Sequence, residues 1–464
     1  MNLKKQNGHS VDMTTGNSVQ IILRFAFPLV AASVIQQMFS LTDIMILGIY
    51  SGNQGLAAVG VSSWPCWFQI SVLTNFGQAA CLTAAVRFGA RNEEELRRVV
   101  GNVYFAAMVL AAFMVLVPQM VIVPFLRMQG TPAEIFDDAV AYLRIIFSGT
   151  LFLLVYNIVA SLLRAVGDSY TSFVAIALSA VVNVVMDVIF VAGFHMGVRG
   201  AAAATIMSQA LSAIICLYRL QSYPVLKMKK KYLRPDPGIQ REYISLCIPM
   251  MAQSFVIAAG GTYVQSCVNR IGVVFAAGVS GSGKVFTLVE TGAVALASAC
   301  ASFVSQNVGA RKFERIREAI RQIFVVSLLL AAATGVFLRL AGRPILSLFV
   351  EGEAIRYGVE YLNVYSFGVL LMYPMYYLRQ TVQALGNVKI PLIAAMLQLV
   401  VRILTAGGLT KLIGYSGIYY ATVAAWAVSI VLIGYVYPRQ FKKCRALAGE
   451  GEKTGESVSA AVRK

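Results

Sequence analysis

Two carboxylates inside apolar runs are the side chains of this sequence best suited to chemistry. Asp187 and Asn183 are the only polar residues within residues 180–191. They stand four residues apart, so on a helix both side chains point to the same side. A second acid, Asp43, lies in the first apolar run. A carboxylate at the centre of a bilayer costs about 2.5–3.5 kcal/mol on insertion scales, so it is rarely incidental.

Polar residues at helical spacing accompany both acids. Gln36 and Ser40 precede Asp43, and Ser179 precedes Asn183. Other apolar runs of the first half add Tyr156, Asn157, Thr205, Ser208, Gln209 and Ser212. No basic residue shares these stripes, so their oxygens predict a hydrated site for a proton or a sodium ion, and the sequence leaves both ions open. The other interpretation is a pair of hydrogen-bonded carboxylates that only fixes helix packing.

The composition places these acids in a membrane. The chain has 464 residues, of which 58% are hydrophobic and 13% charged, and its mean hydropathy is +0.71. Soluble domains carry about 25% charged residues, so the composition excludes that class. The net charge of +18 belongs to loops between apolar runs. We therefore expect membrane lipids as partners and no nucleic acid.

The pattern predicts an all-α integral membrane protein with twelve transmembrane helices. The expected spans are residues 21–47, 55–86, 98–123, 136–163, 170–194, 200–222, 243–268, 274–305, 319–341, 355–385, 388–410 and 417–438. Most of the 39 lysines and arginines fall in the tails and in alternate loops. The positive-inside rule then predicts a multi-pass protein of the cell membrane with both termini in the cytoplasm.

An internal repeat divides the chain into two halves of six spans. Gly89-Ala90-Arg91 recurs as Gly309-Ala310-Arg311, and Pro28 pairs with Pro249. Gly167 pairs with Gly386, and residues 197–200 pair with residues 414–417. An even number of spans per half makes the repeat parallel. The predicted parts are a cytoplasmic tail (1–19), a first lobe (20–222), a cytoplasmic linker (223–242), a second lobe (243–440) and a second cytoplasmic tail (441–464).

The second half lacks the acid pair. The repeat aligns Asn183 with Arg402 and Asp187 with Ala406. The one acid deep in a span of that half is Glu290, for which an ion pair with Lys284 or Arg402 is favoured over a direct role in transport. The halves therefore share a shape but differ in chemistry.

Other chemistry is weakly indicated. Both histidines lie outside the spans or at a span end, so no metal site and no cofactor is expected. Residues 278–284 have a faint phosphate-loop character without its spacing, and their small residues favour close helix packing instead. No nucleophile and base stand together, so we do not expect an enzyme.

The sequence resembles the multidrug and toxic compound extrusion (MATE) family over residues 20–440. The resemblance rests on Thr42-Asp43, the Gly-Ala-Arg segments, LRAVGD at residues 163–168, the Asn183/Asp187 pair and GAAAATIMSQ at residues 200–209. It implies two six-helix lobes enclosing a V-shaped central cavity. It also implies exchange of organic cations for protons or sodium by alternating access.

The resemblance also assigns residues. The implied cation or proton site comprises Asp43, Asn157, Asn183, Asp187 and Thr205. Candidates for the substrate cavity are Gln36, Ser40, Tyr156, Ser179, Gln209, Gln253, Glu290, Tyr373 and Arg402. Some family members carry carboxylates on spans seven and ten. This sequence has no counterpart to them, because the cores of those two spans contain no acid.

These observations predict a proton- or sodium-coupled multidrug efflux antiporter, a monomer that exports small organic, mostly cationic compounds. Two alternatives remain open. A flippase for a lipid-linked saccharide would share the repeat but line its cavity with basic residues. A receptor or scaffold without transport would not need buried acids.

Overall fold

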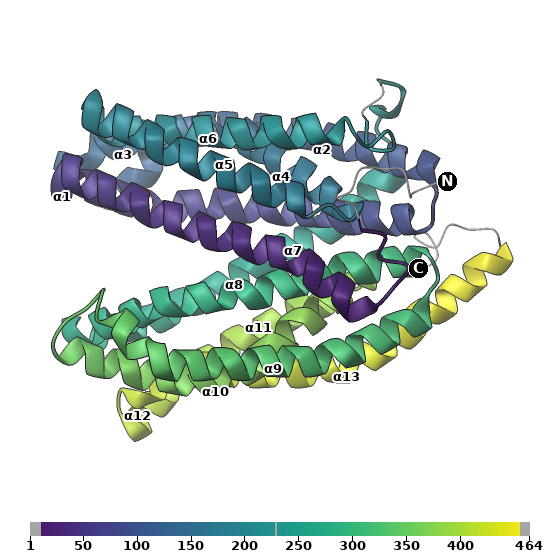
Figure 1. The fold of residues 1–464 in the computed structure, drawn as a ribbon. Coiled ribbons are helices and arrows are strands. Elements are labelled where there is room, and N and C mark those ends of the chain that lie inside the picture. The colour runs from purple at the N-terminus through teal and green to yellow at the C-terminus, as the bar shows by residue number, and fades with distance from the viewer. Residues whose placement is uncertain (1–10, 228–229, 455–464) are drawn as a thin grey trace. The chain divides into compact units, whose positions relative to one another are not determined.

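The computed structural model describes residues 11–227 and 230–454, and all regular secondary structure in these residues is helical. The first half contains α1 (Ser18–Gly89), α2 (Glu93–Met128), α3 (Ala133–Ser148), α4 (Thr150–Ala165), α5 (Tyr170–Asp187), the π-helix η2 (Val188–Gly193) and α6 (Gly197–Leu220). The second contains the short η3 (Lys230–Tyr232), α7 (Pro237–Ile271), α8 (Val273–Gly309), α9 (Phe313–Leu346), α10 (Glu353–Ala384), α11 (Lys389–Leu404), the π-helix η4 (Thr405–Leu409), α12 (Thr410–Ile413) and α13 (Ser416–Thr454). Figure 1 labels most of these elements, from α1 in purple to α13 in green and yellow.

The helices account for the twelve expected spans. Among the described residues, nine helices are long and apolar enough to cross a membrane, or ten if the pair α3 and α4, bent by 42°, forms one span. α1 contains two expected spans, which meet at Gly52, where φ 62° and ψ −161° break the helix. The remaining span is α10, whose tyrosines lower its hydropathy. The second segment of α1 and α10 bring the ten to twelve.

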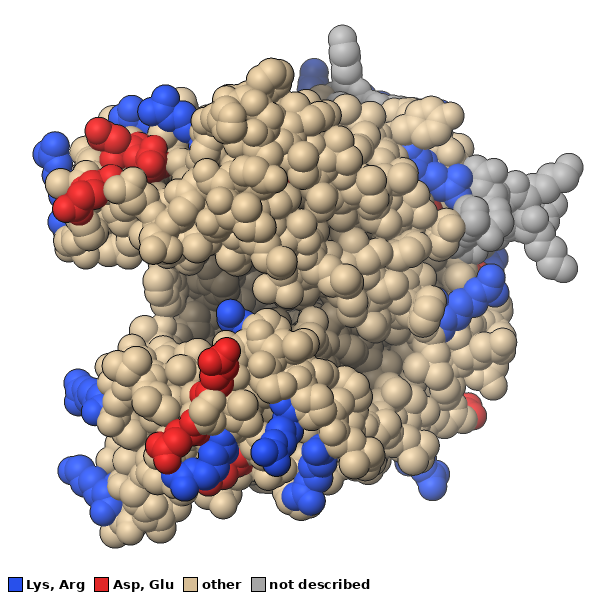
Figure 2. All heavy atoms as spheres, turned by 60° about the vertical axis from the view of Figure 1, so that its left-hand side comes forward, with Lys and Arg blue, Asp and Glu red and all other residues tan. Residues whose placement is uncertain are grey.

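Large apolar side chains cover the outside, as expected for a lipid-facing surface. Phe27, Met120 and Val431 are 75%, 79% and 71% exposed. Figure 2 shows broad uncharged surface on one face, with Lys, Arg, Asp and Glu gathered in a few groups. In water such surface would drive aggregation, so the exposed residues agree with the composition.

The chain forms two compact units. Of the described residues, one unit comprises residues 11–12 and 27–247, and the other comprises residues 13–26 and 248–454. The chain passes between them inside α1, one residue before Pro28, and inside α7, one residue before Pro249. These prolines are the first pair of the predicted repeat.

Backbone geometry repeats between the halves. Arg91 and Arg311 adopt φ 54° and 58°, and Gly167 and Gly386 adopt φ 89° and 86°. At Gly167 a Cβ would also lie 2.2 Å from the Val11 carbonyl oxygen, so only glycine fits this turn. The π-helices η2 and η4 also follow equivalent helices, α5 and α11. The repeat predicted from short motifs is therefore present in the backbone.

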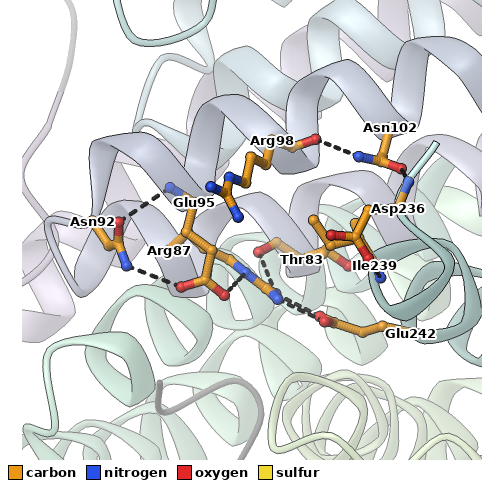
Figure 3. A network of polar contacts seen from close by, with 9 residues as sticks. All are labelled: Thr83, Arg87, Asn92, Glu95, Arg98, Asn102, Asp236, Ile239 and Glu242. Atoms are coloured by element: carbon orange, nitrogen blue, oxygen red, sulfur yellow. Dashed lines mark hydrogen bonds and ion pairs between the residues drawn. The ribbon is translucent and has the colours of Figure 1, made fainter. Parts of the chain in front are cut away.

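In the first unit, the end of α1 holds the start of α7. Arg87 is 2% exposed and donates to Glu95 at 3.1 Å and to Glu242 at 2.6 Å. The Tyr243 hydroxyl donates to the Phe76 carbonyl at 2.6 Å. Figure 3 shows the Arg87 guanidinium directed at both carboxylates. These contacts tie residues 237–247 to the first unit.

In the second unit, the equivalent turn holds the segment before α1. Asn307, which the repeat aligns with Arg87, donates to the Met13 carbonyl at 3.0 Å. Lys312 donates to the Thr14 carbonyl at 2.7 Å, and Arg315 donates to the Gly16 carbonyl at 2.6 Å. Residues 13–26 and 237–247 are thus exchanged arms, since each contains the start of the first helix of one half and packs in the other half's unit.

Three segments differ from the expected layout. α7 begins at Pro237, inside the expected linker 223–242, because Asp236 accepts from the Gly238 and Ile239 amides at the helix start. The expected tail 441–464 is helical as far as Thr454, and α1 begins at Ser18. Residues 1–10 and 455–464 of the two tails lie outside the described residues, as does Lys229 of the basic linker.

The glycine-rich stretch of α8 is a packing surface. A Cβ at Gly278 would lie 2.3 Å from the Ala354 carbonyl oxygen, and Ser282 donates to the Gly358 carbonyl at 2.9 Å. The small residues therefore bring α8 and α10 into close contact, as the sequence predicted.

Candidate functional site

The structure brings Asp43 and Asp187 together in the first unit. Asp187 is the last residue of α5, where the chain changes to a π-helix, and is 1% exposed. Asp43 is a half-buried residue of α1. The two side chains are close enough to interact, although no hydrogen bond of normal geometry joins them. π-helical turns often occur at functional sites, because the extra residue shifts the side chains that follow.

Five buried polar atoms at this point have no hydrogen-bond partner. They are Asp43 Oδ1, both carboxylate oxygens of Asp187, and Asn183 Oδ1 and Nδ2. Asn183 is fully buried. Leaving one buried polar group unsatisfied costs about 1–3 kcal/mol, and more if it is charged. Such a concentration of unsatisfied oxygens is suited to a bound proton or cation.

Apolar side chains pack near the acids, together with one hydroxyl that the sequence analysis missed. Leu47 and Val191, each four residues from one of the acids in the chain, belong to a buried core cluster, and Val184 packs against it. Tyr142 of α3 also packs against this cluster and interacts electrostatically with both acids and with Cys66. The sequence did not indicate a role for Tyr142, because a single tyrosine in an apolar run is typical of a core or interface residue.

Asn157 and Thr205, the other residues of the predicted cation site, are bonded within their own helices. Asn157 Nδ2 donates to the Leu153 carbonyl at 2.9 Å, and Thr205 Oγ1 donates to the Ala201 carbonyl at 2.9 Å. No hydrogen bond in the described residues joins either side chain to the acids. Their place in a cation site stays a prediction.

The polar stripes of α5 and α6 meet. Ser212 donates to Ser179 at 2.7 Å, and Ser179 is 5% exposed. On α1, Gln36 and Ser40 are exposed, and Ser40 donates to the Gln36 carbonyl at 3.0 Å. Two further candidates for the substrate cavity, Tyr156 and Gln209, are half-buried.

Two candidates for the substrate cavity in the second unit, Gln253 and Tyr373, form hydrogen bonds with different partners. Gln253 on α7 accepts from Gln383 on α10 at 2.9 Å. Tyr373 lies 3.1 Å from the Thr334 hydroxyl and donates to the Val289 carbonyl at 3.3 Å. Both side chains are at least nine-tenths buried.

Glu290 on α8 lies in a cluster with opposite charge. Its carboxylate accepts a hydrogen bond from Tyr376 and interacts electrostatically with Arg379 and Arg402. Of the two partners considered from the sequence, the structure favours Arg402, because Lys284 instead stands over the Phe349 ring at 5.3 Å. Arg379 and Tyr376 lie on α10, and no pattern in the sequence predicts which residues of α8 and α10 face each other.

The acid pair has no equivalent in the second unit. In the alignment of the two halves, Val264 corresponds to Asp43, Arg402 to Asn183 and Ala406 to Asp187. Two spans that carry carboxylates in the first unit therefore carry aliphatic side chains and a guanidinium in the second.

This combination of a twelve-span parallel repeat with an acid pair in the first half alone can be compared with known proteins. A family model described as MatE matches residues 28–189 and 249–406. The chain belongs to the MATE family of efflux transporters. The same model matches each half once, and the matches begin at Pro28 and Pro249, which confirms the internal repeat.

Named relatives are similar over most of the chain. The probable multidrug resistance protein YoeA of Bacillus subtilis is 26% identical over 433 residues, which cover 90% of this chain and 93% of the relative. The probable multidrug resistance protein NorM of Thermotoga maritima is 26% identical over 341 residues, which cover 72% and 73%. A solved outward-facing multidrug resistance MATE transporter has a TM-score of 0.88 at 20% identity, covering 94% of this chain and 99% of that one. This likeness shows that the chain has the MATE fold.

Proposed function

We propose that this MATE protein is a multidrug efflux antiporter that exports small organic, mostly cationic compounds in exchange for a proton or a sodium ion. It acts as a monomer in the cell membrane with both termini in the cytoplasm. The multidrug resistance relatives support efflux. The basic loops and tails support the orientation.

The observation that carries the coupling is the group of unpartnered oxygens on Asp43, Asn183 and Asp187. Two ionised carboxylates close together in apolar surroundings repel each other unless a cation or a proton binds to them. Occupancy of the site therefore changes how α1 and α5 pack. A substrate that binds better to one packing than to the other is then coupled to the ion, because coupling requires only different affinities for two states.

The experiment is ethidium efflux from energised membrane vesicles that contain the protein, with proton and sodium gradients imposed separately. Efflux driven by one gradient identifies the ion. Efflux that needs neither gradient contradicts antiport. No efflux under either gradient, from folded protein, contradicts the proposal and favours the flippase for a lipid-linked saccharide.

The residues are tested by Asp43→Asn and Asp187→Asn, which keep side-chain size and remove one charge each. We expect both variants to insert normally and to lose gradient-driven efflux. Asp137→Asn is the matched control, because Asp137 is an exposed acid of α3. Full efflux in both site variants would refute the role of the acid pair.

A further inference from the structure

The charged cluster on α8, α10 and α11 of the second unit carries more positive than negative charge. Arg379 and Arg402 are 9% and 7% exposed, and Glu290 is the carboxylate that interacts with both. Neither guanidinium forms an ion pair within 4.0 Å in the part of the chain that the structure describes. Two buried cations thus share one carboxylate, so the cluster has a net charge of +1.

Unused hydrogen-bond donors accompany this excess charge. Nε of Arg379 and Nε of Arg402 are buried without a partner. One donor of Arg402 is used, since it binds the Ile257 carbonyl of α7 at 3.0 Å. A Cβ at Gly260 would lie 3.1 Å from Arg402 Cδ, so the glycine leaves room for the arginine against α7. The guanidinium is therefore held in place by backbone, not by an anion.

Aromatic side chains interact with both guanidiniums. Arg379 lies over the Tyr376 ring at 4.4 Å. Arg402 interacts electrostatically with Tyr361 and Tyr365, whose rings stack at 4.2 Å between centroids. Glu290 and Tyr376 are half-buried, so the cluster is not sealed from its surroundings.

An unpaired guanidinium in an apolar region is costly, and a carboxylate is the group that its planar donors fit best. An aromatic carboxylate would supply the missing negative charge, accept from the unused Nε donors and stack on the neighbouring rings. A purely cationic compound would instead be repelled by the net positive charge. The cluster thus distinguishes between two classes of organic compound.

We propose that Arg379 and Arg402 form a binding site for the carboxylate of aromatic substrates, so that these two arginines set the preference for an aromatic acid over its ester. This inference rests on the proposed export of organic compounds. It adds a second site of opposite charge to the acid pair of the first unit.

The test uses two dyes that differ by one methyl group. Rhodamine 110 has a free carboxylate, and rhodamine 123 is its methyl ester. Binding of each dye to the purified full-length protein is measured by fluorescence polarisation. We expect Arg379→Gln and Arg402→Gln to weaken rhodamine 110 binding tenfold to about a hundredfold, the range for a lost charge-assisted hydrogen bond. Rhodamine 123, which lacks the carboxylate, should bind at least as tightly to both variants as to the wild type.

Arg339→Gln is the matched control. Arg339 belongs to the same unit but is exposed, and it donates to Ser366 at 3.1 Å and lies over the Phe367 ring. Its loss removes one positive charge without touching the cluster, so binding of neither dye should change. Retained rhodamine 123 binding shows that an arginine variant is folded.

Several outcomes separate the possibilities. Equal loss of both dyes in folded variants, or no loss of either, overturns the inference and leaves the proposed function intact. If both arginine variants fail to fold, the wild-type protein decides, because it must bind the acid at least as tightly as the ester. Weaker binding of the acid overturns the inference. Binding of neither dye by the wild type contradicts the multidrug function and the inference together.

Discussion

The same substitution at two buried aspartates should change stability in opposite directions. Asp187 and Asp168 are 1% and 0% exposed, and both lie in the first unit. Asp187 has no hydrogen-bond partner for either oxygen. Asp168 accepts from the Thr171 amide at 3.0 Å, the Tyr223 hydroxyl at 2.9 Å and Arg219 Nε at 3.3 Å.

The contacts set the magnitudes. Asp187→Asn removes no hydrogen bond and ends the repulsion by Asp43, so it replaces a charged unsatisfied group by a neutral one. We expect a gain of about 1–2 kcal/mol in the free energy of unfolding. Asp168→Asn removes the charge opposite Arg219 and puts an amide donor where Tyr223 donates. We expect a loss of about 3–5 kcal/mol, the usual cost of breaking a buried charged pair.

The assay is thermal unfolding of purified protein in detergent, in a sodium-free buffer, followed by tryptophan fluorescence. For a unit of 150–250 residues about 2–4 °C corresponds to 1 kcal/mol, so Tm should rise by about 2–8 °C for Asp187→Asn. It should fall by at least about 6 °C for Asp168→Asn. A fall of Tm in both variants would refute the reasoning, since it would mean that Asp187 has a structural partner.

Two further pairs of variants test the packing. Arg87→Gln should lower the free energy of unfolding by about 3–5 kcal/mol, because it removes the buried guanidinium from its ion pair with Glu242. Arg97→Gln, which breaks a more exposed pair within α2, should cost at most about 1 kcal/mol in chemical denaturation. Gly278→Ala should lower the free energy of unfolding by about 1–3 kcal/mol, because the new Cβ meets the Ala354 carbonyl of α10. Gly283→Ala places its Cβ in open space and should leave Tm unchanged or raise it. Equal effects in the two glycine variants would contradict the close contact between α8 and α10.

The sequence predicted the main features of the fold because a membrane makes them conspicuous. Twelve apolar runs of spanning length and a repeated Gly-Ala-Arg segment were enough for the span count and the parallel repeat. Asp43 and Asp187 were identified because a carboxylate inside a membrane span is energetically costly and usually has a function. Their polar stripes predicted one shared hydrated site, although the two acids lie 144 positions apart in the chain.

Contacts between helices were beyond the sequence. Tyr142 and Tyr376 are ordinary tyrosines in apolar runs until the helix packing shows which acids they face. The break in α1 at Gly52 could not be told from an ordinary loop, because a single residue with positive φ connects two helices there. The packing of Arg87 on Glu242 depends on two segments 155 residues apart, and no local pattern encodes it.

The exchanged arms bear on how such a protein could arise. Each Gly-Ala-Arg end holds the beginning of the other half's first helix, through Arg87 in one case and Asn307 in the other. This is the topology that results when a gene duplication fuses the two copies of a dimer that swapped its amino-terminal arms. The linker then only had to join chains that were already interlocked. Each unit is therefore completed by an arm that the other half of the sequence encodes.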